Sequence, residues 1–144
     1  MAHTYALQLI HCVFSTKDRL PLINDPSRLW TYMRAIGCNT GVNLTAIGGT
    51  KTHVHILMTV PARSSTSDIV RTLKANSSRW MHELGCTFAW QDGYAAISVS
   101  PSQGPMVVQY IDNQEEHHAK HTFEQEYTSL LAKSGIAFDM NEVF

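Results

Sequence analysis

The stretch Val42-Asn-Leu-Thr-Ala-Ile-Gly-Gly-Thr-Lys-Thr-His-Val-His-Ile-Leu-Met-Thr-Val60 has the pattern of two β-strands joined by a tight turn. Apolar and β-branched residues fill both arms, which predicts strands over residues 42–47 and 52–60 around the Gly-Gly-Thr-Lys turn. Because side chains alternate along a strand, His53 and His55 are expected on one face, with Cα atoms about 6.5–7 Å apart. Two imidazoles at that spacing can hold one metal ion, but a half-exposed strand face is the simpler interpretation.

Outward from this hairpin, strands and helices alternate in the order β-α-β-β-α-β-α. Besides the two strands above, the pattern predicts a strand over 5–14, a helix from Asp25-Pro26 to Gly37 and a helix from about Ser65 to Leu84. Residues 88–90 and 94–99 are expected to form a short hairpin or a bent edge strand. A helix from about Met106 to His118 or beyond and a last helix over 123–133 follow. This order is typical of an α+β fold. We expect a ferredoxin-like antiparallel sheet of four to five strands with helices on one face, plus a C-terminal helix.

The composition is that of one globular domain over residues 1–144, with 44% hydrophobic and 16% charged residues. The net charge of −1 argues against a nucleic-acid-binding protein, but it hides an asymmetry. Residues 1–82 carry nine Lys/Arg and three Asp, a net charge of +6, whereas residues 83–144 carry two Lys and nine acids, a net charge of −7. Such a division indicates an anionic partner for the first half, or two parts of one surface that balance each other.

Tyr110 and Gln114 are four residues apart on the predicted C-terminal helix and therefore share one face. A tyrosine, an amide and imidazoles on this face indicate a functional site, although an exposed helix side is an equal alternative. His117, His118 and His121 continue roughly the same face. We interpret these three as solvated residues near a helix C-terminus, where positive charge is favourable, and not as metal ligands.

The two features together suggest phosphoryl chemistry. A phenol is almost entirely protonated at neutral pH and becomes a useful nucleophile toward phosphorus when a metal ion polarises the phosphate. Two imidazoles and one amide oxygen are neutral ligands that leave positions open for phosphate oxygens and water. This set favours Mg²⁺ or Mn²⁺ over a closed structural zinc site.

The motifs, in this order and over nearly the whole chain, resemble those of the HUH single-strand DNA transposases, the single-tyrosine enzymes of the insertion sequence 200/605 class. The segments that carry the resemblance are Phe14-Ser15-Thr16-Lys17, His53-Val54-His55, Ser77-Ser78-Arg79-Trp80, Trp90-Gln91-Asp92-Gly93-Tyr94, Ser98-Val99-Ser100 and Tyr110 to His118.

The resemblance implies that His53, His55 and Gln114 bind the metal ion and that Tyr110 attacks single-stranded DNA to form a 5′-phosphotyrosine. It also implies rejoining without ATP, recognition of hairpins near the ends of the element, and a homodimer in which the tyrosine helix acts in cis or in trans. The segment Ser100–Pro105, with two prolines and a glycine, is expected to be the hinge before that helix. The family also contains host-adopted enzymes that cut repeat hairpins.

A non-catalytic nucleic-acid module and a histidine-metal hydrolase of small molecules are the alternatives. Candidate DNA-contacting residues are Lys51, Arg63, Arg71, Lys74 and Arg79. We expect neither a signal peptide nor a membrane span, and therefore a cytoplasmic enzyme of a prokaryote that is associated with the nucleoid during the reaction. The three cysteines, Cys12, Cys38 and Cys86, form no CxxC pair, which predicts reduced thiols.

Overall fold

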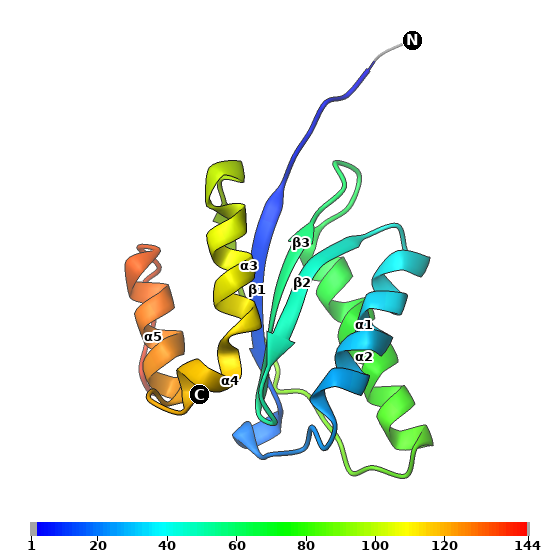
Figure 1. Ribbon diagram of the computed structural model, residues 1–144, viewed down its shortest axis with the longest axis vertical. Helices are drawn as coiled ribbons and strands as arrows, with labels where there is room; N and C mark the ends of the chain where they lie inside the picture. The colour runs from blue at the N-terminus through cyan, green and yellow to red at the C-terminus, as the bar shows by residue number, and fades with distance from the viewer. Residues whose placement is uncertain (1–2, 144) are drawn as a thin grey trace.

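In the computed structural model, which describes residues 3–143, a four-stranded antiparallel sheet separates two groups of helices (Figure 1). In chain order the elements are β1 (Leu9–Ser15), η1 (Lys17–Arg19), α1 (Pro26–Asn39), β2 (Asn43–Gly49), β3 (His53–Thr59), α2 (Thr66–Glu83), β4 (Ala95–Val99), η2 (Pro101–Gln103), α3 (Gly104–Asp112), α4 (Gln114–His118) and α5 (Phe123–Lys133).

The strand order is β2-β3-β1-β4, with every neighbouring pair antiparallel. This is the order of a ferredoxin-like split βαβ unit and confirms the predicted α+β class. The two central strands pair over their full lengths, and their register places Val13 of β1 opposite His55 of β3. Both histidines of β3 therefore lie on a central strand of the sheet, and both are fully buried.

The alternation of side chains along β3 divides the molecule into two layers. Val54, Ile56 and Met58 are buried in the large apolar core beneath α1 and α2. Leu57 packs with Ile111 of α3 on the other face, which is also the face of His53 and His55. Figure 1 shows α1 and α2 on one side of the sheet, and α3, α4 and α5 on the other. The predicted helix layer and the separate C-terminal helices are thus both present.

The structure differs from the predicted elements at the start of β1 and clarifies residues 88–99, which include β4. The first strand begins at Leu9 and not at Tyr5, because its last ladder contact is the bond from the Val60 amide to the Gln8 carbonyl. Tyr5 is 93% exposed there. Of the two predicted forms of residues 88–99, the structure has the edge strand, β4, preceded by an isolated bridge between Thr16 and Trp90.

The tyrosine helix differs from the prediction at both of its ends. It begins at Gly104, two residues earlier than predicted, because Pro105 fits the first helical turn and the hinge segment is the short 3-10 turn η2. It stops at Asp112, since Asn113 has φ −99° and ψ 18°, and α4 starts at Gln114. The helical path changes direction between α3 and α4 (Figure 1), and beyond this bend the ring of His118 lies against that of His53, with centroids 4.4 Å apart.

Gly48 of β2 allows α3 to lie directly against the sheet. A Cβ atom at this position would be 2.5 Å from the carbonyl oxygen of Ile111. We expect Gly48→Ala to lower the free energy of unfolding by about 1–3 kcal/mol because the helix backbone must move away. Urea unfolding measures this change. Gly104→Ala is the control, since its Cβ would meet only Leu9 at 3.8 Å, and equal stabilities of the two variants would contradict the prediction.

Candidate active site

The structure brings together the four residues that the sequence singled out as catalytic or metal-binding. Nε2 of His53 lies 3.2 Å from Oε1 of Gln114, and both side chains are buried. The rings of His55 and Tyr110 pack edge to face, with centroids 5.6 Å apart. Gln114 also donates to the Tyr110 carbonyl oxygen at 3.4 Å, as expected for residues one helical turn apart. The two histidines of β3 thus meet the pair formed by Tyr110 and Gln114 at one point, next to α5.

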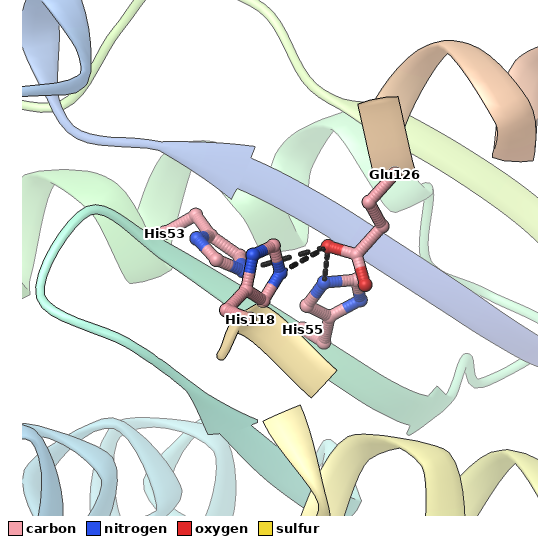
Figure 2. A group of neighbouring side chains, drawn as sticks. All are labelled: His53, His55, His118 and Glu126. Atoms are coloured by element: carbon pink, nitrogen blue, oxygen red, sulfur yellow. Dashed lines mark hydrogen bonds and ion pairs between the residues drawn. The ribbon is translucent and has the colours of Figure 1, made fainter. Parts of the chain in front are cut away.

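The carboxylate of Glu126, on α5, contacts all four of these residues, and Figure 2 shows it directed at His53, His55 and His118. Its Oε1 is 2.9 Å from Nε2 of both His55 and His118, and 3.5 Å from Nε2 of His53. Its Oε2 accepts the hydroxyl proton of Tyr110 and an amide proton of Gln114, the latter at 3.0 Å. One carboxylate therefore touches the histidine pair on one side and the tyrosine on the other.

A second set of contacts fixes the orientation of the two strand histidines. Nδ1 of His53 lies 3.1 Å from the hydroxyls of Thr50 and Thr52. Nδ1 of His55 lies 2.8 Å from Nε2 of His11, a diagonal neighbour on β1. Such outer contacts set which ring nitrogen carries the proton and direct the other nitrogen toward a ligand. For both histidines the nitrogen left for the site is Nε2.

The electrostatics of the site follow from its burial. Burial, with the neighbouring His55, lowers the pKa of His53 and of His11 to about 3, so both imidazoles are neutral at pH 7. Burial raises the pKa of Tyr110, and the adjacent Glu126 raises it further. Burial alone would raise the pKa of Glu126, but hydrogen bonds from His118, His55 and Tyr110 hold it well below its usual value. The site thus combines neutral imidazoles, a protonated phenol and an ionised carboxylate.

These side chains fit a divalent metal ion. One ligand atom each from His53, His55, His118 and Glu126 lies within 4.8 Å of the others, and the Gln114 amide oxygen adjoins them. Neutral imidazole and ionised carboxylate are the protonation states that metal ligation requires. The carbonyl and carboxylate oxygens favour a hard cation, and the imidazoles widen the range to transition metals.

Three residues of the site were not among the predicted site residues. His118 was expected in solvent with His117 and His121, which is wrong, because the bend at Asn113 turns it inward. His121 alone of the three is exposed. Glu126 and His11 gave no local signal. The alternation of β1 places His11 on the same face as Val13. The residues of β3 that lie next to His11, however, depend on the register between the two strands.

Three of the candidate DNA-contacting residues, Arg71, Lys74 and Arg79, lie on α2, apart from this site. Arg71 and Arg79 are exposed on α2, on the opposite face of the sheet, and contact Asp68 and Asn76 on the same helix. Lys74 is half-buried and donates to the carbonyls of Gln91 and Gly93, so it holds the loop before β4. Two further candidates, Lys51 in the β2–β3 turn and Arg63 before α2, are exposed.

Tyr110 borders solvent on the side away from β3. An open hollow of about 450 Å³ adjoins it, lined by Met106, Gln109, Tyr110, Asn113, Glu116, His117, Lys120 and His121. A substrate can therefore approach the tyrosine although the histidines behind it are buried.

Acid should destabilise the metal-free protein because of His11 and His53. Their pKa of about 3 lies below the ordinary 6.5, so between these values the unfolded chain binds more protons than the folded protein. The free energy of unfolding should fall as the pH drops from 6 to 5, by up to about 1.4 kcal/mol per pH unit for each histidine. Urea unfolding in EDTA measures this slope. It should be smaller in His11→Gln, and an equal slope in that variant would contradict the assignment.

A ferredoxin-like sheet that presents two strand histidines to a tyrosine on one helix and a glutamine at the start of the next defines a DNA-cleaving enzyme of the single-tyrosine, HUH type. The family model described as "Transposase IS200 like" matches residues 4–114. The chain belongs to this family, and it is a transposase. The match includes His53, His55, Tyr110 and Gln114 and ends before His118 and Glu126.

Solved structures agree with this assignment. A candidate transposase from Deinococcus radiodurans R1 is 25% identical, with a TM-score of 0.62, over 79% of this chain and 96% of that one. A REP-associated tyrosine transposase bound to a REP hairpin is 16% identical, also with a TM-score of 0.62, over 96% of this chain and 91% of that one, and this likeness concerns the fold. No curated protein matches the chain. Within residues 3–143, no helix is long and apolar enough to cross a membrane.

Proposed function

We propose that the protein cleaves and rejoins single-stranded DNA at element ends through a 5′-phosphotyrosine on Tyr110. One observation carries the proposal. The Tyr110 hydroxyl, His53, His55 and Gln114 all contact the same buried carboxylate, that of Glu126. A nucleophile and a metal site that adjoin each other are what a phosphodiester needs for attack at phosphorus. The strand histidines and the helix residues Tyr110 and Gln114 come from distant parts of the chain, and only the fold brings them together.

In the proposed step, the Tyr110 oxygen forms a bond to phosphorus and the bond from phosphorus to the 3′ oxygen breaks. The phenol loses its proton and the leaving 3′ oxygen gains one, so the step is balanced in protons. The upstream fragment leaves with a 3′-hydroxyl, and the downstream fragment stays attached to the protein. Attack by a 3′-hydroxyl reverses these changes and rejoins the strand, so the energy of the phosphodiester is retained. His53, His55 and Gln114 would hold Mg²⁺ or Mn²⁺, which polarises the phosphate and stabilises its developing charge.

This chain's own residues prepare the tyrosine for that step. Tyr110 is protonated in the resting site, because burial and the Glu126 carboxylate raise its pKa. The hydroxyl proton points at Glu126, so the oxygen keeps a lone pair free for the incoming phosphorus. The ring packs on His55 and His11 at centroid distances of 5.6 and 6.2 Å, which restricts its rotation.

The DNA partner is proposed to be a single strand with a hairpin. One similar structure is described as bound to a REP hairpin, which supports this proposal without setting the sequence of the hairpin. Lys51, Arg63, Arg71 and Arg79 are exposed cations that can contact phosphates. Lys74 stays a proposed contact, although two carbonyls already hold its ammonium group. A homodimer likewise remains a proposal, and within one chain Tyr110 already reaches its own histidines.

The test is incubation of the protein with single-stranded DNA from the flanks of its own gene, in Mg²⁺ or Mn²⁺. We expect a protein–DNA band that survives denaturation and carries a label placed at the 3′ end of the DNA. A 5′ label should leave with the released fragment. Binding without any such band, for every flanking strand tried, would favour a non-catalytic nucleic-acid module.

A further inference from the structure

Glu126 belongs to a part of the chain that the family model does not match. It lies on α5, whose first turn is held by a capping box between Thr122 and Gln125. Phe123, one turn earlier on the same face, packs against the ring of His53 with centroids 4.5 Å apart. The Glu126 carboxylate is therefore positioned by a capped helix that packs on the site, and not by a flexible loop.

We propose that Glu126 is a ligand shared by the metal ion and the nucleophile. One carboxylate oxygen completes the metal site, while the other holds the hydroxyl of Tyr110 beside it. The inference deepens the proposed function and rests on it, since it concerns the same metal ion and the same tyrosine.

The charge of the site supports the metal-binding half of this proposal. The Glu126 side chain is 3% exposed, and its recorded partners are imidazole, phenol and amide groups, none of which carries a fixed charge. A buried carboxylate without a cation is unfavourable, so a divalent ion would supply the missing positive charge. The other proposed ligands are imidazoles and an amide, and Glu126 would be the only carboxylate among them, with oxygen donors of the type that Mg²⁺ and Mn²⁺ prefer.

The division of contacts supports the positioning half. Oε1 faces His53, His55 and His118 at 2.9 to 3.5 Å, whereas Oε2 faces Tyr110, Gln114 and, at 3.3 Å, Nε2 of His117. The two oxygens thus face two different groups of partners. A carboxylate that merely filled an apolar gap would not need to divide its oxygens between a set of metal ligands and a nucleophile.

The first test measures Mn²⁺ binding to the full-length protein by calorimetry, without DNA. We expect Glu126→Gln to weaken binding at least tenfold, because it removes the anionic ligand and keeps the shape. Glu83→Gln is the control, as it removes the same charge at the exposed end of α2. Equal or tighter binding by Glu126→Gln would overturn the proposal, since the carboxylate would then only block the site.

The second test addresses the tyrosine. At saturating Mn²⁺, Glu126→Gln should still lower kcat of adduct formation at least tenfold with little change in KM for DNA, and Glu126→Asp should restore part of the rate. A wild-type rate at saturating Mn²⁺ would overturn the positioning role.

Urea unfolding in EDTA shows whether the variants fold. If Glu126→Gln does not fold, the shorter carboxylate of Glu126→Asp carries both measurements, and unchanged affinity and rate there would overturn the proposal. If the wild type binds no Mn²⁺, the metal site of the proposed function fails. If the wild type binds Mn²⁺ and Glu126→Gln binds it equally well, only the present inference fails.

Discussion

Tyr110→Phe is expected to abolish the covalent protein–DNA adduct, a loss of more than about 10³-fold in the rate of strand cleavage. The substitution removes one oxygen atom, the proposed nucleophile, and leaves the ring that packs on His55 and His11. The readout is the denaturation-resistant band formed with single-stranded DNA labelled at its 3′ end. Tyr5→Phe is the matched control, because that ring is 93% exposed and Tyr5 precedes the first strand. A normal adduct with Tyr110→Phe would show that another residue is the nucleophile.

The same variant decides between cis and trans action. His55→Ala keeps the tyrosine but lacks a proposed metal ligand, so each of the two variants should be inactive alone. If a mixture of the two forms adducts, one chain's tyrosine serves its partner's histidines. If the mixture stays inactive, the enzyme acts in cis, as the placement of Tyr110 beside its own His55 favours.

His55→Ala is expected to weaken Mn²⁺ binding at least about 100-fold and to remove cleavage. The imidazole is fully buried, its Nε2 faces Glu126, and its Nδ1 contacts His11. Loss of outer contacts alone typically costs 10–100-fold in metal affinity, and a direct ligand should cost more. Calorimetry with Mn²⁺ measures the change. The control is His3→Ala, an exposed histidine near the N-terminus, and full metal affinity in His55→Ala would exclude this residue as a ligand.

The sequence was informative where a local period alone positions the side chains. The strand period put His53 and His55 on one face, and the helical period put Tyr110 and Gln114 on another. The element order also predicted the ferredoxin-like sheet. In each case the inference needed only the geometry of one strand or helix, or the order in which they follow each other.

The remaining parts of the site depend on contacts between elements that are distant in the sequence. His11 meets His55 only because of the strand register, and Glu126 reaches the site only because α5 packs on Val13 of β1 and Ala95 of β4. The wrong prediction for His118 has a more local cause. A continuous helix from Met106 would have carried it past the sheet, but the break at Asn113 redirects it. Sequence periodicity contains no information on either docking or the direction of a bend.

The sheet that separates the two helix layers also constrains the path of the DNA. Tyr110 opens to solvent on one face, whereas Arg71 and Arg79 are exposed on the helix that covers the other face. A nucleic acid that touches both must travel around an edge of the sheet. The protected footprint on the DNA would then extend well beyond the scissile phosphate, and recognition and cleavage would use different segments of one folded strand.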